Sequence, residues 1–217
     1  MIEVRGDIYD NDGTQSFVGG STILTTIVAG SANGQKMDSL GSVDVPSSAV
    51  SSNTLTIGTT AMTLSKNTTY TNQTVVLPQT AYKVGSWNLV GSSIEDILLT
   101  TLSFDIDSVT NATFSADDMT NVYAVIKSNG VTALTTSPVG TASAADNNVS
   151  VNYTLAKNAS VTVEFYATLG STVTAADSVK TDLTVTGQSL TSGSSITATS
   201  ADTDGQTLTA GSGSLTI

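Results

Sequence analysis

The segment Leu98-Leu99-Thr100-Thr101-Leu102-Ser103-Phe104-Asp105-Ile106-Asp107 alternates mainly apolar with polar residues. At a period of two, Leu98, Leu102, Phe104 and Ile106 share one side, and Ser103, Asp105 and Asp107 share the other. Successive side chains of a β-strand point to opposite faces of its sheet. The segment therefore predicts a strand with one face in a core and the other in water, with Leu98 facing inward.

The same alternation recurs at 149–155 and 161–169, where Thr162 and Glu164 are expected to face outward. Further strands are predicted at 22–29, 53–57, 74–77, 82–90, 121–127, 181–186, 195–199 and 206–209. Turn-forming residues gather at 10–13, 128–130 and 202–205, loops are predicted at 30–52 and 136–148, and one helical turn is predicted after Ser115. Many short strands separated by such turns predict an all-β fold of immunoglobulin-like β-sandwich type.

The composition excludes several classes of function. The 217 residues contain no cysteine and no histidine, so disulfides, the common zinc sites and histidine-based catalysis are excluded. Charged residues make up 12% and the net charge is −11, which disfavours nucleic-acid binding because phosphate would be repelled. No apolar run is long enough for a membrane span, and the first residues do not form a leader peptide.

Part of the chain repeats. Residues 53–58 (NTLTIG) match 206–211 (QTLTAG), and residues 25–29 line up with 181–185. The alternative is chance similarity between threonine-rich strands. The repeat predicts a partial N-terminal sandwich unit at 1–57, a full sandwich domain at 58–205 and a terminal strand at 206–217. A chain with an incomplete unit is typical of an array whose units are completed by strand exchange with a neighbour.

Three parts of the chain have characteristic strand and turn patterns: the run 83–89 (KVGSWNL) with 91–104, the segment 116–123 (ADDMTNVY) and the closing 207–217. Together they resemble tandem β-sandwich repeats of large surface proteins in candidate-phylum (Patescibacteria-type) bacteria. The resemblance covers 58–217 and, as a partial unit, 1–57. It implies an extracellular structural component of a surface layer or cell envelope.

Two clusters with the pattern D-x-D-G are candidates for calcium binding. Asp10 with Asp12, and Asp202 with Asp204, would present carboxylate oxygens, the ligands that Ca²⁺ prefers. The alternative is that aspartate and glycine serve only to form β-turns. No other cofactor is predicted.

Six Asn-x-Ser/Thr sequons are candidates for glycosylation: Asn67, Asn72, Asn111, Asn148, Asn152 and Asn158. Chance also produces such sequons in a chain this rich in threonine. The single tryptophan, Trp87, could stack on a sugar, but its alternation with Leu89 favours a place in the core. With three glutamates and no identifiable catalytic pair, the sequence does not predict an enzyme.

The function predicted is an extracellular structural protein that forms a filament or surface-layer-like array by head-to-tail association with copies of itself. The strand 206–217 is the predicted assembly strand, either within its own chain or donated to the next subunit. Its pocket-filling residues would be Leu208, Ala210, Leu215 and Ile217. The alternative is an adhesin, a phage-fibre domain or a carbohydrate-binding module that contacts cell-surface glycans through its loops.

Overall fold

The structure is a computed structural model, and it describes residues 3–6, 20–110, 113–144, 147–191 and 193–212. The chain divides into two compact units, Met1–Thr59 and Thr60–Ile217. Each unit is described by itself. The fold is all-β, as the sequence predicts, with one short 3₁₀ helix among the described residues.

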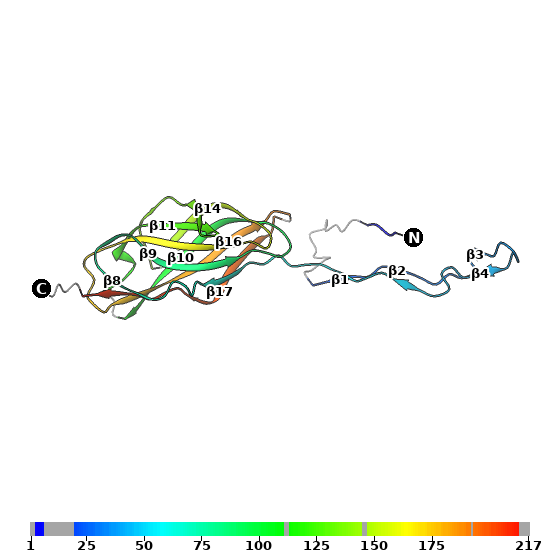
Figure 1. The fold of residues 1–217 in the computed structure, drawn as a ribbon, viewed down its shortest axis with the longest axis horizontal. Coiled ribbons are helices and arrows are strands. Elements are labelled where there is room, and N and C mark those ends of the chain that lie inside the picture. The colour runs from blue at the N-terminus through cyan, green and yellow to red at the C-terminus, as the bar shows by residue number, and fades with distance from the viewer. Residues whose placement is uncertain (1–2, 7–19, 111–112, 145–146, 192, 213–217) are drawn as a thin grey trace. The chain divides into compact units, whose positions relative to one another are not determined.

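The second unit is a β-sandwich of two sheets whose strands pair mainly in antiparallel fashion (Figure 1). The β10 sheet has the order β14-β10-β16-β18-β8, with β17 also paired to β16. Its strands are β8 (Gln73–Val76), β10 (Ile97–Thr110), β14 (Asn147–Leu155), β16 (Ser178–Ser189), β17 (Ser195–Asp204) and β18 (Leu208–Gly211). The pair β8–β18 is parallel.

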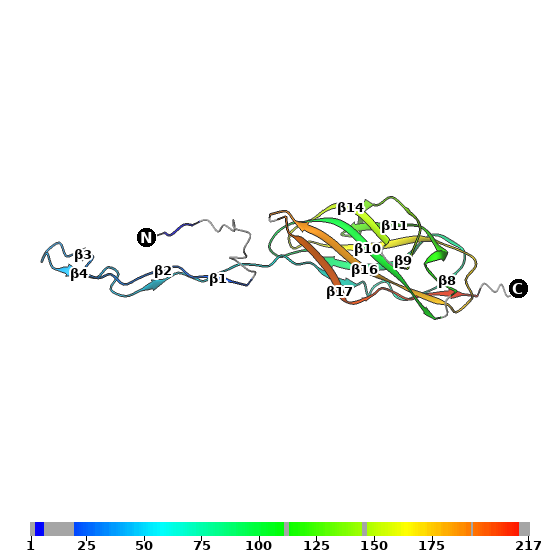
Figure 2. The ribbon, with the colours of Figure 1, turned by 180° about the vertical axis from the view of Figure 1, so that it is seen from behind.

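The β15 sheet has the order β12-β11-β15-β9-β7, with β13 also paired to β11. Its strands are β7 (Thr63–Lys66), β9 (Gln79–Val90), β11 (Met119–Ser128), β12 (Val131–Thr135), β13 (Val139–Thr141) and β15 (Ser160–Leu169). Figure 2 shows the strands of both sheets from behind.

The core lies between the two sheets and is organised around aromatic rings. Trp87, Phe104 and Phe165 are fully buried. The Trp87 and Phe165 rings meet edge to face, with centroids 5.7 Å apart, and Phe104 lies 4.3 Å from Phe165. The prediction that Trp87 fills the core is confirmed. The indole needs two glycines beside it, because a Cβ on Gly85 or Gly205 would come within 3 Å of its ring.

One orientation predicted from the alternation is wrong. Ile97 and Leu99 are buried, whereas Leu98 is only partly buried and faces away from the core. The cause is a register shift between Leu99 and Thr101, where β10 pairs with both β14 and β16. A bulge changes which face successive residues occupy, so the alternation that holds for Leu102 and its successors does not extend back to Leu98.

Local turn chemistry follows the sequence at two places. Asn129 and Gly130 join β11 to β12, and both have positive φ (50° and 79°), which suits a two-residue hairpin turn. The predicted helical turn is the 3₁₀ helix η1 (Ala116–Asp118), and the Asp118 carboxylate accepts the Ser115 N–H at its start.

The two stretches predicted as loops contain strands. The stretch 30–52 holds β3 (Gly34–Gln35), β4 (Ser42–Val43) and β5 (Val50–Ser51), and 136–148 holds β13 and the first residues of β14. These strands are short and lack apolar alternation, so no periodic signal marks them in the sequence. The strands β7 and β12 were likewise not predicted.

Residues 20–58 of the first unit form a two-stranded antiparallel ribbon, here called the arm. The strand β1 (Thr22–Ile23) pairs with β6 (Leu55–Thr56), β2 (Thr26–Ile27) pairs with β5, and β3 pairs with β4 near the turn (Figure 1). No described residue of 1–59 is buried. An isolated two-stranded hairpin is marginally stable in water at best.

Candidate functional site

The arm has the same strand register as the end of the sandwich. The sequence match places β1 on the start of β16, and places β5 and β6 on the end of β17 and on β18. Three paired rungs then coincide: Thr22–Thr56 with Ser178–Thr209, Ile23–Leu55 with Val179–Leu208, and Thr26–Ser51 with Asp182–Asp204. Agreement at three rungs supports a genuine repeat over chance similarity.

The matched residues have opposite environments in the two units. In the sandwich, Val179 and Leu208 face the core and are 1% and 2% exposed. In the arm, Leu55 is 54% exposed, and Ile23 is only partly buried. The face that carries Ile23, Ile27 and Leu55 therefore has the apolar pattern of a core face, but among the described residues it is not buried. We call it the core-type face.

A hollow of about 280 Å³ lies on the arm beside this face. Ile27, Val50 and Val4 supply its apolar lining, and hydroxyl groups from the two ribbon strands supply the rest. Such exposed apolar surface is typical of a face that another polypeptide covers.

The terminal strand lies within its own sandwich. β18 pairs in parallel with β8 and antiparallel with β16, and Leu208 and Ala210 are buried in the core. These two residues therefore fill a place in their own chain, which is the first of the two alternatives predicted. Leu215 and Ile217 lie outside the described residues.

A buried carboxylate stands on the outer face of the β15 sheet. Glu164 was predicted to face outward, and it does, but its side chain is only 6% exposed. Lys83 and Lys127 donate to its two oxygens over 3.1 Å and 2.7 Å, and the Tyr166 hydroxyl donates over 2.8 Å. Burial opposes ionisation of Glu164, but the hydrogen bonds from Lys127, Tyr166 and Lys83 outweigh burial and lower its pKa.

Tyrosines surround this carboxylate. The Tyr123 and Tyr166 rings stack with centroids 5.3 Å apart, and the Lys83 ammonium lies 4.1 Å from the centre of the Tyr70 ring. Burial and the neighbouring Glu164 raise the pKa of the Tyr166 hydroxyl, so it stays protonated and keeps donating. The sequence did not predict this cluster, because it depends on the register of β9, β11 and β15.

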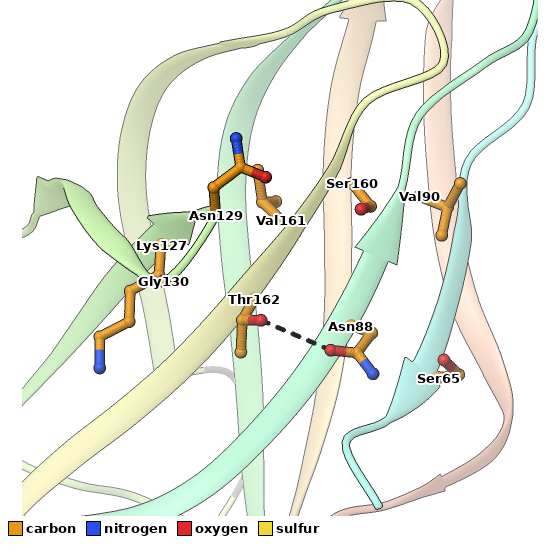
Figure 3. Close-up of a pocket in the computed structure, with 9 residues that line it drawn as sticks. All are labelled: Ser65, Asn88, Val90, Lys127, Asn129, Gly130, Ser160, Val161 and Thr162. Carbon is orange, nitrogen blue, oxygen red and sulfur yellow. Dashed lines mark hydrogen bonds between the residues drawn. The ribbon is translucent and has the colours of Figure 1, made fainter. Parts of the chain in front are cut away.

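A polar groove lies beside the cluster on the same sheet (Figure 3). One rung of four paired residues crosses it: Lys127, Thr162, Asn88 and Ser65, on β11, β15, β9 and β7. Ser160, Val161 and Val90, together with Asn129 and Gly130 of the β11–β12 turn, complete the lining, and the volume is about 500 Å³. The Thr162 hydroxyl lies 3.5 Å from Oδ1 of Asn88, as the dashed line in Figure 3 shows.

Most polar groups of the groove have no partner in the protein. Within the described part of the chain, the side chains of Ser65, Asn129 and Ser160 and the amide nitrogen of Asn88 form no hydrogen bond with protein atoms. The Lys127 ammonium, in contrast, is held by Glu164. The groove thus presents hydroxyl and amide groups to solvent with no free charge.

Glu95 is engaged by its own chain. Its carboxylate accepts hydrogen bonds from the Thr60 hydroxyl, from the Ser189 hydroxyl over 2.6 Å and from the Thr191 N–H over 3.2 Å. The hydrogen bonds from Ser189 and Thr60 lower the pKa of Glu95 to about 2. This carboxylate therefore ties residue 60 to the turn between β16 and β17.

The predicted calcium ligands are described only in part. Asp10 and Asp12 lie outside the described residues. Asp202 and Asp204 belong to β17, so the strand continues through three of the four residues predicted as a turn. Backbone register places Asp105, Asp182 and Asp204 in one rung across three strands. Among the described residues, no group of three or more acidic side chains is arranged to hold a metal ion.

Most sequons in the described part of the chain lie at exposed positions. Asn72, Asn148, Asn152 and Asn158 are exposed, and Asn148 and Asn152 lie on the edge strand β14. Asn67 is partly buried, and its amide nitrogen donates to the Ser86 hydroxyl over 3.0 Å. Asn111 lies outside the described residues.

Comparison with models of known protein families and with curated proteins found no match. Among the described residues, no helix is both long enough and apolar enough to cross a membrane.

Proposed function

We propose that this protein is an extracellular structural protein that assembles into a filament or surface-layer-like array through its N-terminal arm. The observation that carries the proposal is the shared register of the arm and the β16–β17–β18 segment. In the sandwich, the residues matched to the core-type face are almost fully buried. The arm has the same pattern of apolar residues, but none of them is buried among the described residues of its unit.

The free energy of covering the arm favours association. Burying a Leu or Ile side chain contributes about 1.5–3 kcal/mol, and Leu55 is still about half exposed. Ile23, Ile27 and Val50 add further area on the same face. These side chains would supply part of the free energy that offsets the entropic cost of association, and main-chain pairing would supply more.

The neighbouring copy offers an acceptor at an open sheet edge. β14 is nine residues long, lies at the edge of the β10 sheet and contains no charged residue and no proline. Strands at sheet edges are usually protected by such residues, and an unprotected edge invites another strand. Pairing of the arm with β14 of the next copy would repeat from copy to copy and give head-to-tail association.

The proposed role is structural rather than enzymatic, and the place of action is the cell surface. The absence of cysteine and histidine and the low share of charged residues support a structural role. The exposed sequons support the cell surface as the place of action.

Paired leucine substitutions in the full chain test this proposal. Leu55 lies on the core-type face, and Leu24 lies between β1 and β2, next to Ile23. Their side chains are 54% and 55% exposed. Leu24 matches Lys180, which is not a core residue. We expect Leu55→Ser to shorten or abolish filaments seen by negative-stain electron microscopy, and Leu24→Ser to leave them unchanged. Equal effects of the two substitutions, or no polymer of the unaltered chain, would argue against the proposal.

A further inference from the structure

We propose that the polar groove on the outer face of the β15 sheet is a binding site for an uncharged oligosaccharide. This inference is independent of the assembly proposed above, because the groove lies wholly within the sandwich unit and shares no residue with the arm.

The hydrogen-bonding groups of the groove match a ligand rich in hydroxyl groups. Asn88 and Asn129 each place an amide donor next to a carbonyl acceptor, and Ser65 and Ser160 have hydroxyls that both donate and accept. Adjacent hydroxyls of a sugar ring offer the same pairing of donor and acceptor. Since these side chains have almost no partners among the described residues, a ligand can use them without breaking the hydrogen bonds described here.

The charge of the groove selects an uncharged ligand. Its only cation is Lys127, whose ammonium is already paired with Glu164. The chain has a net charge of −11, so a sulfated, phosphorylated or uronic-acid ligand would meet an unfavourable potential.

The shape of the groove favours several linked sugars over one. The polar rung spans four strands, which at the usual strand spacing is about 14 Å. This length exceeds one sugar ring. Val90 is 43% exposed in the lining and offers an apolar contact for the C–H face of a ring.

Further along β15, the stacked pair Tyr123–Tyr166 follows Glu164 on the same outer face. A longer oligosaccharide that runs along β15 would therefore meet aromatic surface after the polar rung.

An array of uncharged and charged oligosaccharides, probed with the full chain, tests the site. The uncharged set comprises cello-, malto-, xylo- and N-acetylchito-oligosaccharides, and each hit is titrated as the free trisaccharide so that avidity does not contribute. We expect at least one uncharged hit, whose Kd rises about tenfold or more in Asn88→Ala and in Thr162→Val. The control Gln188→Ala, at an exposed position of β16 on the opposite sheet, should change Kd less than twofold.

Thermal melting of each variant checks the fold, and Thr162→Val keeps the side-chain shape if Asn88→Ala proves unstable. Three results would overturn the proposal: no binding of any uncharged oligosaccharide, binding of charged oligosaccharides alone, or equal affinity of the wild type and both groove variants. Loss of filaments in Asn88→Ala with an empty array would also overturn it, because the groove would then bind protein.

Discussion

Replacing Glu164 by glutamine should destabilise the sandwich by about 2–3 kcal/mol. The substitution keeps the shape of the side chain but removes the charge that Lys83 and Lys127 contact over 3.1 Å and 2.7 Å. A hydrogen bond to a charged group contributes about 1.5–3 kcal/mol. Both lysines are about a quarter exposed and can turn to water, so the loss should be well below the sum of two full contributions.

Urea denaturation followed by tryptophan fluorescence measures this change. Trp87 is the only tryptophan and is fully buried, so its emission reports the unfolding of the sandwich. Asp117→Asn is the control, because Asp117 is exposed and its loss changes the net charge by the same amount. If Glu164→Gln lowers the free energy of unfolding no more than Asp117→Asn does, the Glu164 carboxylate does not stabilise the outer face of the sheet and the reasoning is refuted.

Three further predictions concern the sandwich. In the folded protein the pKa of Glu95 is lowered to about 2, and the pKa of Glu164 is also lowered. The two carboxylates therefore stabilise the folded state fully above about pH 4.5, and this contribution is lost as the pH falls through their folded-state pKa values. Stability measured from pH 5 to 2.5 should fall, and the fall should be shallower in Glu164→Gln; identical curves would contradict this. Gly205→Ala should lower the free energy of unfolding by about 1–3 kcal/mol or more, because the new Cβ would lie 2.7 Å from Trp87 and 2.5 Å from a backbone oxygen. An unchanged melting temperature would contradict this packing. Leu208→Ala should lower the free energy of unfolding of the dilute monomer by about 2–5 kcal/mol, since the Leu208 side chain is buried in the core of its own chain. If residues 206–217 instead paired with a neighbouring copy, the substitution would reduce assembly without changing the stability of the monomer.

The sequence predicted the features that are local. Alternation located the long strands, such as 161–169, and Asn129-Gly130 marked a hairpin turn by its chemistry. The bulge near Thr100 was missed, because a register shift arises from pairing with β14 and β16 and leaves no periodic signal.

The candidate sites depend on contacts between distant segments. Glu164 looked like an ordinary outward residue, and only the register of β9, β11 and β15 brings Lys83 and Lys127 to it. The groove likewise forms from four strands, whose polar residues have no distinguishing pattern in the sequence. The repeat was predicted, because the match of 53–58 to 206–211 lies in the sequence itself, but the two-stranded form of the arm was not. What the sequence did not show is that the matched residues differ in burial.

Hydrogen exchange of the arm at different protein concentrations tests the central claim most directly. If copies associate through the arm, the amide groups of 22–27 and 50–56 should exchange rapidly in dilute protein and become protected as the concentration rises, while β16 stays protected throughout. Arm amides that exchange at the same rate at every concentration at which filaments form would contradict the account.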